Sequence, residues 1–182
     1  MSGEAPKGGW ARWLPLILFG GFFALVLVGL LWPADRNVES AMIGKPLPAF
    51  DLPQAVPDRP ALASTTFADG KPRLLNIFAS WCIPCAAEAS QLEQLRAAGV
   101  EIVGVAVRDR PQDLQGFLAR NGNPYAAIGR DDRSRVQFMV GSSGVPESFV
   151  IDGKGVIRYQ QLGGITDADV PKILEKLKEA GQ

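Results

Sequence analysis

A chain of 182 residues, 47% of them hydrophobic and 21% charged, has the composition of one globular domain with a short additional segment. This excludes wholesale disorder and a protein with many membrane spans. The 19 basic and 19 acidic residues balance, so no net field draws the chain to nucleic acid. Without histidine and with only two cysteines, the chain lacks the ligands of a structural zinc site and the imidazole base of Cys-His and Ser-His-Asp hydrolases. Ala86 follows Cys85, which also excludes the Cys-x-x-Cys-His motif of c-type haem attachment.

The first predicted element is a membrane-spanning helix over residues 13–32. This stretch contains no charged residue, and its length is about that needed to cross a hydrocarbon core of about 30 Å. Lys7 and Arg12 precede it within a few residues. By the positive-inside rule, residues 1–12 are expected in the cytoplasm and the residues after Trp32 on the outer side of the membrane.

The alternative for this segment is a cleaved signal peptide. Its apolar region usually spans only about 7 to 15 residues and ends at an Ala-x-Ala-like site, for which Val38-Glu39-Ser40 is a poor substitute. We therefore expect an uncleaved anchor, a linker over 33–41 and a domain over 42–182. Export would place the two cysteines where disulfides form and persist.

The domain begins with a proline-rich lead-in, for which we expect few regular elements up to residue 72. Two short apolar segments, 73–79 and 100–107, have the β-branched composition of buried parallel strands. Between them, 86–98 consists of strong helix formers and ends at Gly99, a natural helix C-cap.

The second half of the domain continues with alternating helices and strands. A hairpin is indicated by the Asp-Gly-Lys-Gly turn at 152–155. The whole order favours a three-layer α/β domain with a mixed central sheet flanked by helices. The predicted elements are a helix at 111–120, a strand at 125–128, a helix at 133–139, hairpin strands at 147–151 and 156–162, and a closing helix at 167–180.

The two cysteines form a Trp-Cys-Ile-Pro-Cys sequence between the first strand and its helix. Cys82 would begin that helix, where unpaired amide hydrogens and the helix dipole favour a thiolate over a thiol of ordinary pKa, about 8.5. This predicts Cys82 as the attacking residue and Cys85, one turn later, as the resolving thiol. Trp81 and Pro84 are expected to tune the pair, with Pro84 holding the helix start.

The competing interpretation of the cysteine pair is a structural disulfide. Closing so short a loop stabilises a fold by only about 2 kcal/mol in the chain-entropy estimate, against about 4.7 kcal/mol for a loop of 100 residues. A redox function is therefore favoured. No cofactor beyond a redox-active Cys82–Cys85 disulfide and no metal is expected.

At these residues the chain resembles the thioredoxin superfamily, and more closely its CcmG/DsbE-type thiol:disulfide interchange proteins of cytochrome c biogenesis. The Trp-Cys-x-x-Cys centre is shared by the superfamily, whereas the Gly-Asn-Pro-Tyr segment at 122–125 and the Gly-Val-Pro-Glu segment at 144–147 are more specific to this branch. The similarity also covers 43–50, 74–82 and 144–152. Ser148 departs from the family's usual threonine but keeps the hydroxyl.

The resemblance implies a thioredoxin fold tethered to the inner membrane by one helix and facing the periplasm. It implies a reductant that keeps the cysteines of apocytochrome c available for haem ligation, within the cytochrome c maturation machinery. Electrons would come from a membrane thiol-disulfide transporter of the DsbD or CcdA type.

The resemblance also implies roles for residues outside the cysteine motif. Pro146 would be cis and face the cysteines, and the Val145 backbone would pair with a bound substrate strand; an ordinary loop turn is the alternative. Glu88 matches a family glutamate that assists proton transfer at Cys85 through water, or it is a solvated helix residue. Glu147 would form an acidic rim beside Pro146, or carry plain surface charge. At Asn76, ordinary thioredoxins have a buried aspartate, so no carboxylate proton acceptor stands there.

Three other functions remain compatible with the sequence. They are a broader TlpA- or ResA-like reductase, a DsbA-like oxidant, and a thioredoxin-fold chaperone that binds apocytochrome without using its cysteines. The direction of electron transfer depends on the reduction potential, which ranges from about −270 to −120 mV in this fold. The Ile83-Pro84 pair between the cysteines does not decide that direction.

Overall fold

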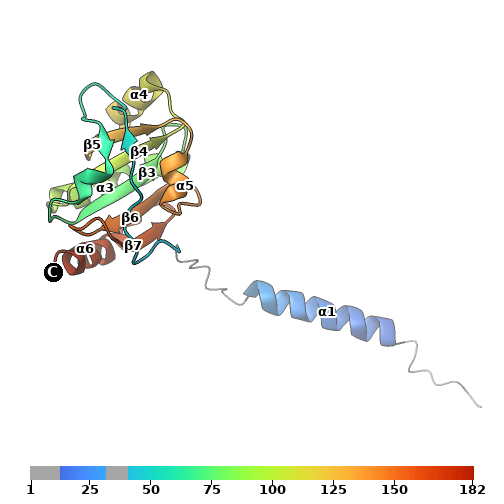
Figure 1. Cartoon of the computed structure of the whole chain (residues 1–182). Coiled ribbons are helices and arrows are strands. Elements are labelled where there is room, and N and C mark those ends of the chain that lie inside the picture. The colour runs from blue at the N-terminus through green and yellow to red at the C-terminus, as the bar shows by residue number, and fades with distance from the viewer. Residues whose placement is uncertain (1–12, 32–40) are drawn as a thin grey trace, which may run out of the picture. The chain divides into compact units, whose positions relative to one another are not determined.

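The structure, a computed structural model, describes residues 13–31 and 41–182, which divide into two units (Figure 1). One unit holds helix α1 (Leu14–Leu31), and the other is a domain built on a five-stranded sheet. The predicted cytoplasmic segment 1–12, with Lys7 and Arg12, lies outside the described residues. So does nearly all of the predicted linker 33–41.

Helix α1 is long and apolar enough to cross a membrane. Its 18 residues include no charged side chain and none is buried. At 1.5 Å per residue the helix is about 27 Å long, close to the thickness of a hydrocarbon core. By length and composition, α1 is a candidate membrane anchor.

The domain is organised around a mixed sheet with the strand order β5-β4-β3-β6-β7. Strands β3, β4 and β5 run parallel, whereas β6 pairs antiparallel with β3 and β7 antiparallel with β6. The prediction of an α/β domain with a mixed central sheet is confirmed, and the structure adds the strand order and register. The strands are β3 (Arg73–Phe78), β4 (Ile102–Val107), β5 (Tyr125–Asp131), β6 (Glu147–Ile151) and β7 (Ile157–Leu162).

Both faces of the sheet are covered, because alternate residues of each buried strand point to opposite sides. On β3, Leu74 and Phe78 belong to one core cluster, whereas Leu75 and Ile77 belong to the other. The first cluster is covered by α3 (Ala89–Ala97), α4 (Pro111–Asn121) and α6 (Asp169–Ala180). The second is covered by β1 (Asp51–Leu52), β2 (Leu62–Ala63), the 3₁₀ helix η2 (Ser64–Phe67) and α5 (Arg135–Met139).

Two predictions of local structure need correction. The helix expected at 86–98 begins earlier and is divided into α2 (Ile83–Ala87) and α3 at Glu88, whose backbone departs from helical geometry with ψ −3°. The lead-in before residue 72 is also more regular than expected. It forms the β1–β2 hairpin, with Leu52 and Leu62 buried against the sheet.

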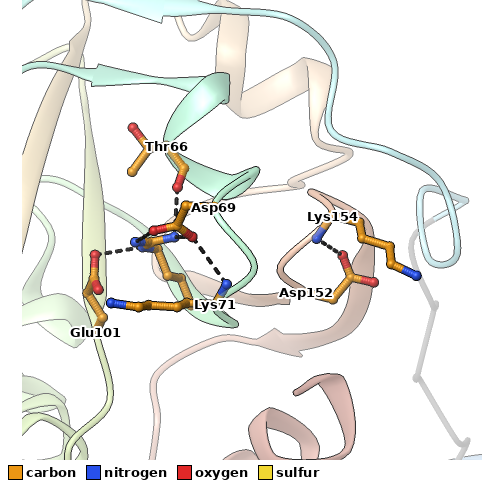
Figure 2. A network of polar contacts seen from close by, with 7 residues as sticks. Thr66, Asp69, Lys71, Glu101, Asp152 and Lys154 are labelled. Atoms are coloured by element: carbon orange, nitrogen blue, oxygen red, sulfur yellow. Dashed lines mark hydrogen bonds and ion pairs between the residues drawn. The ribbon is translucent and has the colours of Figure 1, made fainter. Parts of the chain in front are cut away.

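A polar network stabilises the end of the sheet far from the cysteines (Figure 2). The Arg73 guanidinium, buried at the start of β3, donates to both Asp69 carboxylate oxygens at 2.6 and 2.7 Å. It also donates to Glu101 at 2.6 Å and to the Thr66 carbonyl at 2.7 Å. These bonds connect η2, β3 and the chain entering β4.

We expect Arg73→Met to lower the free energy of unfolding by about 2 kcal/mol, because hydrogen bonds to a charged group are each worth about 1.5–3 kcal/mol and the freed carboxylates can turn to solvent. Urea unfolding of residues 38–182 measures the change. The control is Arg96→Met, since among residues 13–31 and 41–182 the Arg96 side chain pairs with Glu93 alone, on the exposed side of α3. An equal effect of both substitutions would contradict the role assigned to Arg73.

Candidate active site

The two cysteines lie where β3 runs into α2. Cys82 is the N-cap of α2, with extended backbone angles φ −91° and ψ 110°, and Cys85 lies in the first turn. Their sulfurs are joined in a disulfide, with 5.3 Å between the Cα atoms. The Cys85 amide donates to Cys82 Sγ at 3.2 Å. Cys82 therefore occupies the position where an amide of the helix start points at its sulfur.

The disulfide is flanked by two exposed apolar side chains. Cys82 is only 5% exposed, whereas Trp81 is 59% and Ile83 85% exposed. Pro84 takes one of the first two helical positions, where a missing amide hydrogen costs little. The buried disulfide thus has, next to it in the chain, exposed apolar side chains that a partner protein can contact.

A buried carboxylate that the sequence analysis did not identify holds the segment before Cys82. Asp109 accepts from the Ser80 backbone amide at 2.5 Å and from Ser80 Oγ at 2.6 Å. Asp109 follows β4 as Ser80 follows β3, and these parallel neighbours end at the same edge of the sheet. The sequence feature that could have indicated this contact is an aspartate just after a buried strand.

Glu88 is buried, which excludes the solvated alternative for this residue. Its side chain is 1% exposed, at the junction between α2 and α3. One carboxylate oxygen accepts from Asn76 Nδ2 at 3.0 Å and the other from the Ile165 amide at 2.8 Å. The carboxyl group therefore lies within the domain, three residues after Cys85 in the chain.

Burial raises the pKa of Glu88 to about 7, although its hydrogen bonds from Ile165 and Asn76 favour the charged form. A group with this pKa is partly ionised at neutral pH, so it can both accept and donate a proton.

Asn76 joins three strands through its side chain. Besides Glu88, its amide donates to Ser148 Oγ at 3.0 Å on β6, and its carbonyl oxygen accepts from the Tyr125 hydroxyl at 2.8 Å on β5. Burial, and secondarily the Glu88 charge, raises the pKa of Tyr125, so this hydroxyl remains a donor. With its carbonyl held by Tyr125, Asn76 presents its amide hydrogens to Glu88.

Tyr125 reaches Asn76 across β4 because the intervening residue is Gly104. A Cβ at Gly104 would lie 2.7 Å from Phe78 Cε1 and 3.0 Å from Tyr125 Cδ1. The rings of Phe78 and Tyr125 stack over this position with centroids 4.6 Å apart. The Gly-Asn-Pro-Tyr segment at 122–125 is more specific to the family branch, but the sequence alone assigned Tyr125 no role.

We expect Tyr125→Phe to move the Glu88 pKa further above 7, because Asn76 is then free to rotate its carbonyl oxygen toward the carboxylate. The Asn76 carbonyl also loses its buried partner, which should cost about 1–3 kcal/mol of stability. An NMR titration of 13C-carboxyl-labelled glutamate measures the pKa. Tyr159→Phe is the control, since within the described part of the chain the Tyr159 hydroxyl bonds to Gln161 alone. An unchanged Glu88 titration in Tyr125→Phe would show that Tyr125 does not orient Asn76.

The loop before β6 faces the same region. The Val145–Pro146 peptide bond is cis. The position of a Cβ on Gly164 would lie 3.6 Å from the Pro84 carbonyl oxygen and 3.9 Å from both Glu88 Oε2 and Pro146 Cγ, so these groups surround one small space. Among residues 13–31 and 41–182, no backbone group pairs with the Val145 amide or carbonyl. That backbone is open to an extended segment.

Glu147 does not form an exposed acidic rim. It is 3% exposed, and its carboxylate accepts from the amide and hydroxyl of Ser143 and from Gln160 Nε2. On β6 it precedes Ser148, which faces Asn76, so Glu147 points to the opposite side of the sheet. The expectation of an acidic rim is therefore wrong, and Glu147 instead holds the loop that carries Pro146.

These groups can together exchange an electron pair and move protons. The Cys82–Cys85 pair accepts two electrons as a disulfide and supplies two electrons as a dithiol, and Glu88 is a buried acid–base group near it in the chain. Within the described ranges, no three Asp, Glu or Cys side chains gather as metal ligands would.

Comparison with known proteins relates the chain to one family over most of its length. The Redoxin family profile matches residues 42–177. The chain is 36% identical to the thiol:disulfide interchange protein DsbE of Escherichia coli K12, an alignment that covers 93% of this chain and 96% of that protein. It is 35% identical to the thiol:disulfide interchange protein HelX of Rhodobacter capsulatus, over 90% and 93% of the two chains.

A solved structure supports the fold. The crystal structure of a thiol:disulfide interchange protein of the thioredoxin family from Chlorobium tepidum superposes with a TM-score of 0.60 at 24% identity. The alignment covers 81% of this chain and all of that one. The domain therefore has the thioredoxin fold.

Proposed function

Because this chain belongs to the Redoxin family and, within it, to the DsbE-type thiol:disulfide interchange proteins, it is a thiol:disulfide oxidoreductase, and we propose that it reduces the cysteines of apocytochrome c before haem ligation. The observation that carries this proposal is the Cys82–Cys85 disulfide at the start of α2, whose Pro84 surrounds one small space together with cis-Pro146 and the buried Glu88. No cofactor beyond this disulfide enters the proposal.

The proposed reaction is two successive thiol–disulfide exchanges. In the reduced protein, the Cys82 thiolate attacks one sulfur of the substrate disulfide, forming a mixed disulfide and releasing the first substrate thiolate. Cys85 then gives its proton, through water, to ionised Glu88 and attacks Cys82 Sγ. This releases the second substrate thiolate and closes the Cys82–Cys85 disulfide, the state seen in the structure.

Other residues would orient the substrate and tune the pair. In the proposal, an extended substrate segment pairs with the free backbone of Val145, against Pro146. Trp81 packs on the substrate from the opposite side of Cys82, and Pro84 fixes the start of α2. Glu147 acts indirectly, since its bonds to Ser143 hold the loop in place.

We further propose that the protein is a single-pass protein of the inner membrane with its domain in the periplasm. The supports are the apolar helix α1 and the basic residues Lys7 and Arg12 before it. The proposed division is a cytoplasmic segment at 1–12, an anchor at 13–32, a linker at 33–41 and the thioredoxin-like domain at 42–182. A membrane thiol-disulfide transporter of the DsbD or CcdA type would return electrons to Cys82–Cys85, alongside the cytochrome c maturation machinery.

Complementation tests the proposed substrate. In a bacterium lacking its own DsbE-type protein, wild-type protein should restore covalent haem in c-type cytochromes, detected by haem peroxidase staining, and Cys82→Ser/Cys85→Ser should not. Restoration by the double variant would instead indicate a chaperone. If the wild type restores reduction of other periplasmic disulfides but not haem attachment, a broader TlpA- or ResA-like reductase is indicated.

A further inference from the structure

A groove that contains three arginines lies beside the reactive centre. Its walls come from the segment before Cys82, the chain after β4 and helix α4. Three exposed arginines and exposed Trp81 line it. We call this the arginine groove; it is defined by Trp81, Arg108, Arg110 and Arg120.

None of the three arginines has a side-chain partner among the residues the structure describes. This differs from the other end of the sheet, where Arg73 and Arg158 are paired with carboxylates. The groove also contains two carboxylates, Asp109, whose oxygens accept from Ser80, and Asp113, so three arginines against two aspartates leave a formal charge of +1. In a chain whose formal charges balance, the groove is therefore positive and holds three guanidinium groups without side-chain partners among the described residues.

Two backbone features place the arginines there. Arg108 has φ +48°, a left-handed conformation that glycine adopts without strain and arginine does not. At Gly116, a Cβ would lie 3.1 Å from Arg120 Nη1, so the absent side chain leaves room for the Arg120 guanidinium against α4. Arg108 thus occupies a position where glycine would fit the backbone better.

We infer that the arginine groove binds an acidic segment of the partner protein, adjacent to the disulfide that Cys82 attacks. Guanidinium groups bind carboxylates in bidentate geometry, and Trp81 adds apolar contact next to the sulfur. The inference rests on the proposed exchange at Cys82 and adds a preference for acidic substrates. Opposite charge should chiefly accelerate association, an effect that salt weakens.

The test compares two looped disulfide peptides that differ only in a flank of three aspartates or three lysines. With the full chain in uncharged detergent micelles at low ionic strength, kcat/KM should be about 10-fold or more higher for the aspartate peptide. Added salt should remove the difference. Arg108→Glu/Arg110→Glu/Arg120→Glu should reverse the preference. The rate at which dithiothreitol, which attacks as a thiolate anion, reduces the protein's own disulfide should be unchanged at high salt, where charge effects are screened.

A charge-matched control is Lys71→Glu/Lys154→Glu/Lys178→Glu, since Lys71 and Lys154 lie at the opposite edge of the sheet from Cys82. Equal behaviour of the two triple variants, or equal kcat/KM for both peptides in the wild type, would overturn the inference. If the wild type reduced neither peptide although dithiothreitol reduced its disulfide, the proposed reductase function itself would fail.

A single substitution separates binding from folding. Arg108→Gly should raise Tm, because it relieves the positive φ, and yet lower the preference for the aspartate peptide. A variant that is more stable and equally selective would show that Arg108 has no part in binding.

Discussion

Replacing Cys82 by serine is expected to reduce disulfide exchange to the uncatalysed rate. A serine hydroxyl does not ionise near neutral pH, so the helix start that points the Cys85 amide at residue 82 has no thiolate to stabilise. The reduction of a looped disulfide peptide by reduced protein, followed by mass spectrometry, measures the loss.

Cys85→Ser is the matched control for this prediction, because the alternative assignment makes Cys85 the attacking cysteine and Cys82 the resolving one. It should attack normally and then stop, accumulating a mixed disulfide between Cys82 and the peptide. If Cys85→Ser were inert and Cys82→Ser accumulated the mixed disulfide, the assignment of attacking and resolving cysteines would be reversed.

Glu88→Gln is expected to slow the resolving step by about 100-fold, the lower range for loss of a positioned acid–base group. In the wild type this step should accelerate as pH rises through about 7, because Glu88 must be ionised to accept the Cys85 proton. The variant should lose that acceleration. Stopped-flow measurement of mixed-disulfide decay gives the profile, and Glu93→Gln, on the surface of α3, is the control.

The same variant should change how stability depends on pH. The folded-state pKa of Glu88 is raised, so between about 4.5 and 7 the folded protein keeps a proton that the unfolded chain releases. This contribution to stability is fully present below about pH 4.5 and is lost as pH rises through about 7. The free energy of unfolding should fall by about 3 kcal/mol over this range. Urea unfolding of Glu88→Gln should show a smaller fall in the free energy of unfolding over this pH range. An identical dependence on pH in both proteins would contradict a raised pKa of Glu88.

The architecture could be predicted because it depends on local patterns. Apolar β-branched segments predicted the β3 and β4 strands, and the turn at 152–155 predicted the hairpin. The β1–β2 hairpin could not be predicted, because its strands are two residues long and gain their stability from packing against the sheet.

The site was predictable in part. The family resemblance identified Glu88 and Asn76, but not the burial of Glu88, which depends on Ile165 far along the chain. The contact between Tyr125 and Asn76 depends on strand order and on Gly104. The expectation for Glu147 was wrong because Glu147 and Ser148 are consecutive on β6, so their side chains point to opposite sides of the sheet.

Reduction potential tests the proposed direction of electron transfer most directly. A variant that retains Trp81 as its only tryptophan can be equilibrated in glutathione or dithiothreitol buffers while its fluorescence is followed. A reductant of apocytochrome c should have a potential near that of thioredoxin, about −270 mV. A value near −120 mV, about 7 kcal/mol away for two electrons, would contradict the account and identify an oxidant.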